Sequence, residues 1–171
     1  MKVQICNTSE NKNPQYSNPT DAGADLRADF SKVTPENPIS VFGDAEFIFK
    51  GENHNVAMLR LEPGTRALIP TGIYTSIPEG YEVQIRPRSG MAIRRGLSVI
   101  NTPGTIDSSY KGQWFIPVIN LGHESVWIED SERIAQAVLN KFEKIEWVDV
   151  NRISELSGED RGGGIGHSGS K

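Results

Sequence analysis

Short segments in which apolar and polar residues alternate are the feature that most constrains the fold of this chain. In 81–86 the apolar Tyr81, Val83 and Ile85 interleave with polar residues, and 73–77 alternates in the same way before a Pro-Glu-Gly turn. A period of two is typical of strands with one buried face. Further short β-rich segments lie at 3–6, 46–50, 56–61, 125–128 and 145–150. With turn formers between them, these segments predict an all-β barrel or sandwich.

Three other segments complete the expected secondary structure. The continuous apolar run at 114–122, WFIPVINLG, predicts a strand that is buried on both faces. Residues 133–142 fit either a helical face or one side of a strand, and the neighbouring strands favour a strand. Residues 89–95 predict a helix of about two turns, with Ser89 in an N-cap-like position and Gly96 as its terminator.

Length and charge limit the classes of function. The 171 residues suffice for one domain with a core. A net charge of −4 argues against a broad nucleic-acid surface, which needs a basic face. No apolar run approaches the ~18 residues of a membrane span, and the polar start of the chain has no room for a signal peptide. With a single cysteine, Cys6, we expect a cytoplasmic protein without membrane or direct nucleic-acid partners.

The tail, RGGGIGHSGSK at 161–171, contains a formal match to the G-x-G-x-x-G phosphate-binding pattern. A dinucleotide-binding site needs a strand before the glycines and a helix after them, and neither is expected here. Two interpretations remain. The glycines are costly to order and favour a frayed end, or the tail orders over a bound anion, with Arg161 and the Ser168 hydroxyl as donors.

Two internal segments carry candidate chemistry. In RPRSG, at 86–90, Arg88 and Ser89 stand where a strand ends and the helix begins. This arrangement is either an anion site or an ordinary capped helix with a surface arginine. In NTPGTIDSSYKG, at 101–112, a hairpin-like loop offers backbone donors and acceptors that can read a planar base.

Two side chains of this loop have alternative interpretations. Asp107, in a mostly apolar setting, either orients and deprotonates water or bonds to nearby turn amides. Tyr110 either packs flat against a sugar or belongs to the core. The three histidines of the chain are His54, His123 and His167. They lie far apart in the sequence and lack the paired spacing of a zinc site.

The order of these segments resembles the trimeric dUTPase family, whose five motifs occur here in sequence. They lie at 21–26 (DAGADL), 88–90, 101–112, 132–136 and in the tail from 161. The resemblance implies a jelly-roll-like distorted β-barrel and a homotrimer with three active sites at subunit interfaces. It also implies Mg²⁺-assisted hydrolysis of dUTP to dUMP and pyrophosphate, which limits uracil in DNA and supplies dUMP for dTMP synthesis. Residues 1–158 would form a single β domain, and 159–171 a flexible C-terminal lid.

The resemblance also assigns roles to individual residues. Asp107 would activate the attacking water, and Tyr110 would lie under the deoxyribose. The uracil-binding loop would comprise Asn101, Gly104, Thr105 and Ile106, and the phosphate contacts from another subunit would be Arg88, Ser89, Gly90 and Gln136. Asp25 would lie near the metal and act on it through water, while Arg161 and Ser168 would contact the terminal phosphate.

Three features depart from the family pattern. Ile165 stands where the family usually carries a Phe that stacks on uracil, which predicts weaker ordering of the tail. Ser109 replaces a common Asp in the loop. Residues 31–55 form a longer connection than usual, which we expect to be a surface excursion; the alternative is a docking element for a protein partner.

Two rival functions are compatible with these motifs. dCTP deaminase shares the fold and the phosphate motifs but needs a Glu in the loop, and 101–112 contains Asp107 and no Glu. The second rival is a binding or regulatory protein that keeps the pocket and turns over little substrate. The altered tail and the insertion are the features that favour it.

Overall fold

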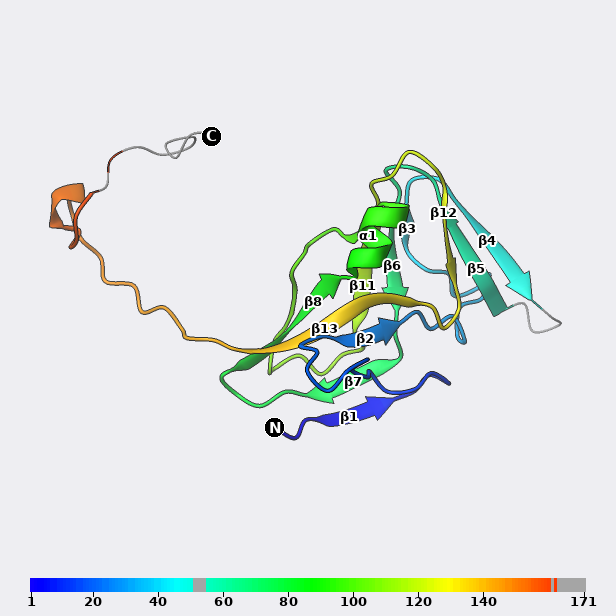
Figure 1. Cartoon of the computed structure of the whole chain (residues 1–171), viewed down its shortest axis with the longest axis horizontal. Coiled ribbons are helices and arrows are strands. Elements are labelled where there is room, and N and C mark those ends of the chain that lie inside the picture. Colours follow the sequence, from blue (N-terminus) through cyan, green and yellow to red (C-terminus); the bar gives the residue numbers. More distant parts are fainter. Residues whose placement is uncertain (51–54, 161, 163–171) are drawn as a thin grey trace.

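The computed structural model describes residues 1–50, 55–160 and 162 and shows a β protein with one short α-helix (Figure 1). A four-stranded antiparallel sheet lies at its centre. Its order is β10 (Gly104–Ile106), β8 (Tyr81–Pro87), β13 (Arg133–Lys141) and β2 (Ala24–Arg27). On β13, Gln136 lies opposite Arg86 of β8 on one side and opposite Asp25 of β2 on the other. One row across the sheet therefore joins three of the segments singled out from the sequence.

Three smaller sheets complete the β structure. One comprises β3 (Val41–Phe42), β6 (Arg66–Pro70), β11 (Phe115–Asn120) and β9 (Leu97–Val99). The others are β12 (Val126–Glu129), β5 (Asn55–Leu61) and β4 (Ala45–Lys50), and the pair β1 (Gln4–Asn7) and β7 (Ile73–Ser76). In the described part of the chain these sheets are open and do not close into one hydrogen-bonded barrel. Alternate strand positions fill the core with the fully buried Leu59, Ile69, Ile116 and Ile128, and Phe30, which follows β2, is also fully buried.

The predicted helix is confirmed as α1 (Ser89–Arg95), which begins directly after β8. Gly96 ends it with φ 68° in the left-handed region, and its N–H donates to the carbonyls of Met91 and Ala92. The N-cap assignment was wrong, because Arg88 holds the cap position in extended conformation and Ser89 is already helical. Met91 is buried and anchors the helix on the core. The helix therefore fixes where Arg88 and Ser89 lie.

Two other strand expectations need correction. The strand β11 alternates between buried and partly exposed residues and is not buried on both faces; Phe115 is 39 % exposed. Residues 142–150 form no strand although their sequence is β-rich, and Trp147 is 80 % exposed. Figure 1 shows why: this segment runs away from the body of the same chain, so it has no strand beside it. The short 3-10 helix η1 (Ile153–Glu155) follows.

Residues 31–55, expected to be a surface excursion, also contribute to the core. Val33 and Ile39 are 4 % and 7 % exposed. Strand β3 pairs with β6, and β4 pairs with β5, so both strands extend existing sheets. The ambiguous segment at 133–142 is a strand, as predicted, and ends at Lys141.

Candidate active site

Asp25 joins three elements at one end of the central sheet. Its Oδ1 accepts a hydrogen bond from Nε of Arg88 at 2.7 Å, and its Oδ2 accepts one from Nη1 of Arg133 at 3.0 Å. Arg88 also donates from Nη1 to the carbonyl of Arg133 at 3.2 Å. The Asp25 side chain is only 16 % exposed. Charge-assisted bonds at this degree of burial hold the Arg88 guanidinium in a defined orientation.

Gln136 is held in place beside this ion pair. Its Nε2 donates to the carbonyl of Pro87 at 2.9 Å. A Cβ built on Gly23 would lie 2.1 Å from Oε1 of Gln136, so the amide occupies the space that any side chain at position 23 would need. The glycine of the segment DAGADL therefore leaves room for the Gln136 amide in this position.

These residues line a hollow of about 580 Å³. It contains Asp25, Arg88, Ser89, Gly90 and Gln136, all singled out from the sequence, and it also contains Asp21, Arg86 and Arg94. Sequence reasoning missed the two further arginines, although their spacing was informative. Arg86 stands two residues before Arg88 on a strand, and Arg94 stands one helical turn after Gly90. The hollow is thus lined by guanidinium groups and suits an anion with several negative oxygens.

The loop at 101–112 is built on the other side of β8. Strand β10 pairs with β8 in antiparallel register, with Ile106 opposite Val83. Asn101 lies against Gly104, where an added Cβ would come within 3.3 Å of the Asn101 Nδ2. Thr105 is exposed, whereas Gly104 and Ile106 are buried. The strand therefore offers its exposed face at Thr105 and is anchored by its two buried neighbours.

A tight turn follows and carries Asp107. The Tyr110 N–H donates to the carbonyl of Asp107 at 3.1 Å, and Nζ of Lys111 donates to the carbonyl of Ser108 at 2.7 Å. The Tyr110 hydroxyl donates to the carbonyl of Gln113 at 2.7 Å, which leaves the ring 41 % exposed. Asp107 is exposed, so its expected apolar setting is absent from the single chain. Among the described residues no donor contacts its carboxylate, and the backbone and Lys111 hold the turn.

One chain does not bring Asp107 to the arginine-lined hollow. Ile106, next to Asp107, pairs with Val83 near the start of β8, whereas Arg88 follows the end of that strand. Val83 and Arg88 are five positions apart along extended chain, which corresponds to about 16 Å. Each chain therefore presents two candidate half-sites, one with guanidinium groups and one with the Asp107 carboxylate and an outer strand that exposes Thr105.

Comparison with known proteins assigns the family. The family model described as dUTPase matches residues 55–169. The chain is also 45 % identical over 169 residues to the deoxyuridine 5'-triphosphate nucleotidohydrolase of Finegoldia magna, and the match covers 99 % of each chain. The chain belongs to the dUTPase family. The sequence resemblance to this family is thereby confirmed.

Solved structures of phage dUTPases share the fold. A variant of the Staphylococcus bacteriophage 80alpha dUTPase with dUpNHpp superposes with a TM-score of 0.72 at 23 % identity, covering 98 % of both chains. A variant of the dUTPase from phage phi11 of S. aureus, described with a structural Mg(II) ion, gives 0.66 at 22 % identity, covering 90 % of this chain and 99 % of that one. At these identities the likeness concerns the fold, which confirms the expected dUTPase-like β architecture.

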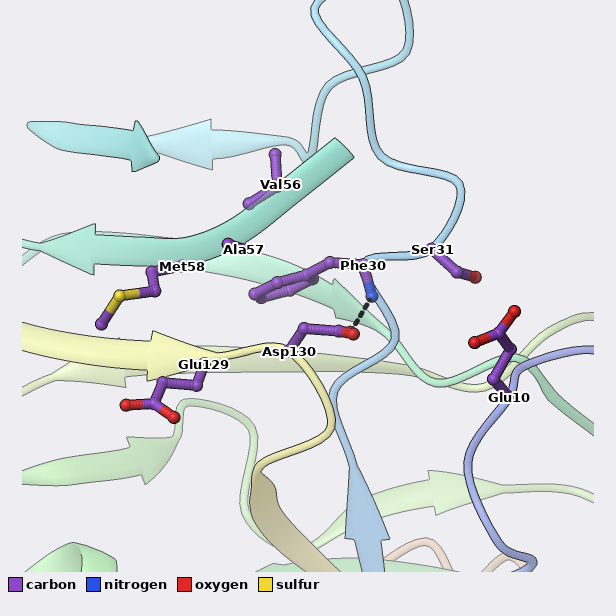
Figure 2. A pocket seen from close by; sticks show the side chains of 8 residues that line it. All are labelled: Glu10, Phe30, Ser31, Val56, Ala57, Met58, Glu129 and Asp130. Atoms are coloured by element: carbon purple, nitrogen blue, oxygen red, sulfur yellow. Dashed lines mark hydrogen bonds between the residues drawn. The ribbon is translucent and has the colours of Figure 1, made fainter. Parts of the chain in front are cut away.

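The dUTPase motifs do not line the other large hollow of the molecule. This hollow has a volume of about 720 Å³. Figure 2 shows that it is lined by Phe30, Val56 and Met58 together with three carboxylates. One of these, Asp130, accepts a hydrogen bond from the Phe30 N–H at 2.7 Å and so has a structural partner. Among the described residues, this hollow is lined by three carboxylates and by no basic residue, so it repels phosphate, whereas the hollow at Arg88 has three arginines against two aspartates and remains the candidate site.

Side chains of the described residues do not form a metal cage. Within 1–50, 55–160 and 162, no group of three or more His, Cys, Asp or Glu could hold an ion. Both oxygens of Asp25 are engaged by guanidinium groups, and Oδ2 of Asp21 accepts from the Asn18 N–H at 2.8 Å.

The predicted tail residues Arg161, Ile165 and Ser168 lie outside the described residues. No helix in the described part is long and apolar enough to cross a bilayer.

Proposed function

We propose that this dUTPase family member hydrolyses dUTP to dUMP and pyrophosphate, and so limits uracil incorporation into DNA and supplies dUMP for dTMP synthesis. The observation that carries the proposal is the pair of complementary half-sites within a chain of this family. The hollow at Arg88 suits the triphosphate, and the loop at 104–107 suits a planar base and a water molecule.

The phosphate half-site is prepared before substrate binds. Arg88, Ser89, Gly90 and Gln136 would contact the phosphates. Asp25 already orients the Arg88 guanidinium at 2.7 Å, and Pro87 already orients the Gln136 amide at 2.9 Å. Side chains that are ordered in advance lose less rotamer entropy on binding, which strengthens recognition.

The second half-site would read the nucleoside and supply the base. The backbone of β10 at Thr105 and Ile106, the outer strand of its sheet, would bind uracil together with Asn101. The half-exposed Tyr110 would lie under the deoxyribose and leave no room for a 2′-hydroxyl. Asp107 would accept a proton from a water that attacks the α-phosphorus in line. The P–O bond to the leaving pyrophosphate breaks as the new P–O bond forms.

Mg²⁺ fits this site as an ion held by substrate. Because the described side chains form no cage, the triphosphate oxygens would be its ligands, and Asp25 and Asp21 would accept hydrogen bonds from its water shell. Bound there, the ion offsets negative charge on the phosphates. The phage phi11 dUTPase described with a structural Mg(II) ion supports a divalent metal in this family.

The two half-sites would meet between subunits of a homotrimer. Because about 16 Å of strand separates them in one chain, the Asp107 of one copy would face the Arg88 of another. The arm after Lys141 supports assembly, since Ile145, Trp147 and Val148 are 69 %, 80 % and 82 % exposed in the single chain. It would carry Arg161, Ile165 and Ser168 over the site of another copy as a lid. Ordered glycine amides would then close over the terminal phosphate.

Pyrophosphate release from dUTP with Mg²⁺ tests the proposed reaction. A protein that only binds nucleotide would release none, and ammonia release from dCTP would identify a deaminase. Subunit mixing tests the assembly. Asp107→Asn and Arg88→Ala chains should each be nearly inactive, but mixed after dissociation they should recover up to roughly a quarter of the sites, as random pairing in a closed oligomer gives. No recovery in verified mixed oligomers would contradict sites shared between copies.

A further inference from the structure

Arg94 lies in the arginine-lined hollow although it belongs to the last turn of α1. A Cβ built on Gly90 would lie 2.6 Å from Nη2 of Arg94. The guanidinium therefore lies directly over Gly90, one turn back along the helix, in the direction that long helical side chains take. The guanidinium charge therefore lies beside Gly90, and Ser89, Gly90 and Arg94 line the same hollow.

The helix supplies this direction but no partner for the charge of Arg94. A cation in the last turn is stabilised when it interacts with the terminal carbonyls or with a nearby carboxylate. Arg95 does the latter, because its Nη1 donates to Glu132. Arg94 instead lies over Gly90 and lines the same hollow as Arg86 and Arg88, where like charges repel one another.

The charges around the hollow show which arginine has an unused donor set. Arg88 is ion-paired with Asp25 at 2.7 Å. Arg86 donates from Nε and Nη2 to Oε1 of Gln84, at 3.1 Å and 2.6 Å. In the described part of the chain, no hydrogen bond or ion pair involves the guanidinium of Arg94. Its N–H donors have no partner among the described residues, and Arg94 lines the hollow.

We propose that Arg94 binds the phosphate chain of the nucleotide beyond the α-phosphate, and so makes the site selective for the triphosphate over the monophosphate. The inference rests on the proposed function and adds a residue that specifies its substrate. Arg88 carries a charge that Asp25 already balances, whereas Arg94 has no ion-pair partner among the described residues and can bind an anionic ligand. Gly90 has a defined part in this arrangement, because the absence of its side chain leaves room for the guanidinium.

The test compares two ligands by calorimetry in the presence of Mg²⁺: dUpNHpp, which has the full phosphate chain, and dUMP, which has one phosphate. Arg94→Ala should weaken dUpNHpp binding about 10–100-fold, the range expected for hydrogen bonds to a charged group, and should change dUMP binding less than about 3-fold. Arg94→Lys should be intermediate, because lysine keeps the charge and loses the planar fork. Ile93→Ala, at an 86 % exposed neighbour on the same helix, is the matched control and should leave both affinities unchanged.

The outcomes separate this inference from the proposed function. An equal loss of affinity for both ligands in Arg94→Ala would assign the arginine a structural role and overturn the inference, as would unchanged dUpNHpp binding. In either case pyrophosphate release by the unaltered protein would leave the proposed function standing. If the unaltered protein binds neither ligand, the proposed function falls, and the inference falls with it. Thermal unfolding of Arg94→Ala and Arg94→Lys, followed by circular dichroism, verifies that each variant is folded.

Discussion

Asp25 and Arg88, 63 residues apart in the sequence, are joined by a hydrogen-bonded ion pair of 2.7 Å that links β2 to the start of α1. The second carboxylate oxygen binds Arg133 of β13. One carboxylate therefore holds together three segments of the dUTPase motif set and orients an arginine of the candidate phosphate site. Its loss is expected to affect stability and nucleotide binding together.

Asp25→Asn should lower the free energy of unfolding by about 1–3 kcal/mol, the cost of leaving a partly buried charged partner unpaired. It should also weaken dUpNHpp binding, because Arg88 loses its fixed orientation. Urea unfolding and calorimetry measure the two effects. Arg133→Ala is the comparison variant; its side chain is 45 % exposed, so its loss should cost less stability. A larger cost for Arg133→Ala than for Asp25→Asn would contradict this account of the cluster.

Asp107→Asn should reduce kcat about 10²–10⁴-fold, because the amide cannot accept the proton of the attacking water. Affinity for dUpNHpp should persist, since the amide has nearly the same size and the turn is held by the backbone and Lys111. Pyrophosphate release and calorimetry provide the two readouts. The control is Asp44→Asn, an exposed aspartate between β3 and β4, which should keep full activity. Undiminished turnover by Asp107→Asn would exclude the carboxylate as the base.

Gly23→Ala should raise KM for dUTP. A Cβ at position 23 would lie 2.1 Å from Oε1 of Gln136, so the Gln136 amide must move. The amide would lose its bond to the Pro87 carbonyl. A double-mutant cycle with Gln136→Ala isolates the cause. Once the amide is absent, Gly23→Ala should add little to the rise in KM. Additive effects of the two substitutions would mean that position 23 acts independently of Gln136.

The sequence predicted those parts of the fold in which the pattern is long enough to read. Alternation in 73–77 and 81–86 indicated β7 and β8, and Gly96 marked the end of α1. Strands β9 and β10 have three residues each, too few to show a period of two. The β-rich segment at 145–150 forms no strand because strand formation depends on a neighbour, which its own chain does not supply.

The candidate site was predictable as a set of residues and not as an arrangement. Motif order indicated Asp25, Arg88 and Gln136, which the structure places around one hollow. Sequence could not show that Asp107 lies at the other end of β8, because that separation depends on the register of β10. Nor could it show that the guanidinium of Arg94 lies over Gly90 in the same hollow, because the packing of β2 and β13 beside the helix forms that hollow.

Glu62 provides a test of pH-dependent stability outside the candidate site. Its carboxylate accepts hydrogen bonds from Arg60 and, at 2.8 Å, from the Ser125 hydroxyl. The hydrogen bond from Arg60 and then the bond from Ser125 hold the pKa of Glu62 below its usual range. Because the folded protein binds the proton less readily than the unfolded chain, the stabilisation is present above the usual glutamate pKa.

That stabilisation should be lost as the pH falls from the usual glutamate pKa, about 4.3, through the lower value in the folded protein. Glu62→Gln should therefore be less stable than the unaltered protein at neutral pH, and the difference should shrink below about pH 4. Urea midpoints across this range measure it. Glu79→Gln, at an exposed turn glutamate without an ion pair in the described residues, should show no comparable change of the difference with pH. If the stability difference between Glu62→Gln and the unaltered protein stays constant across this pH range, the charge of Glu62 does not contribute to stability.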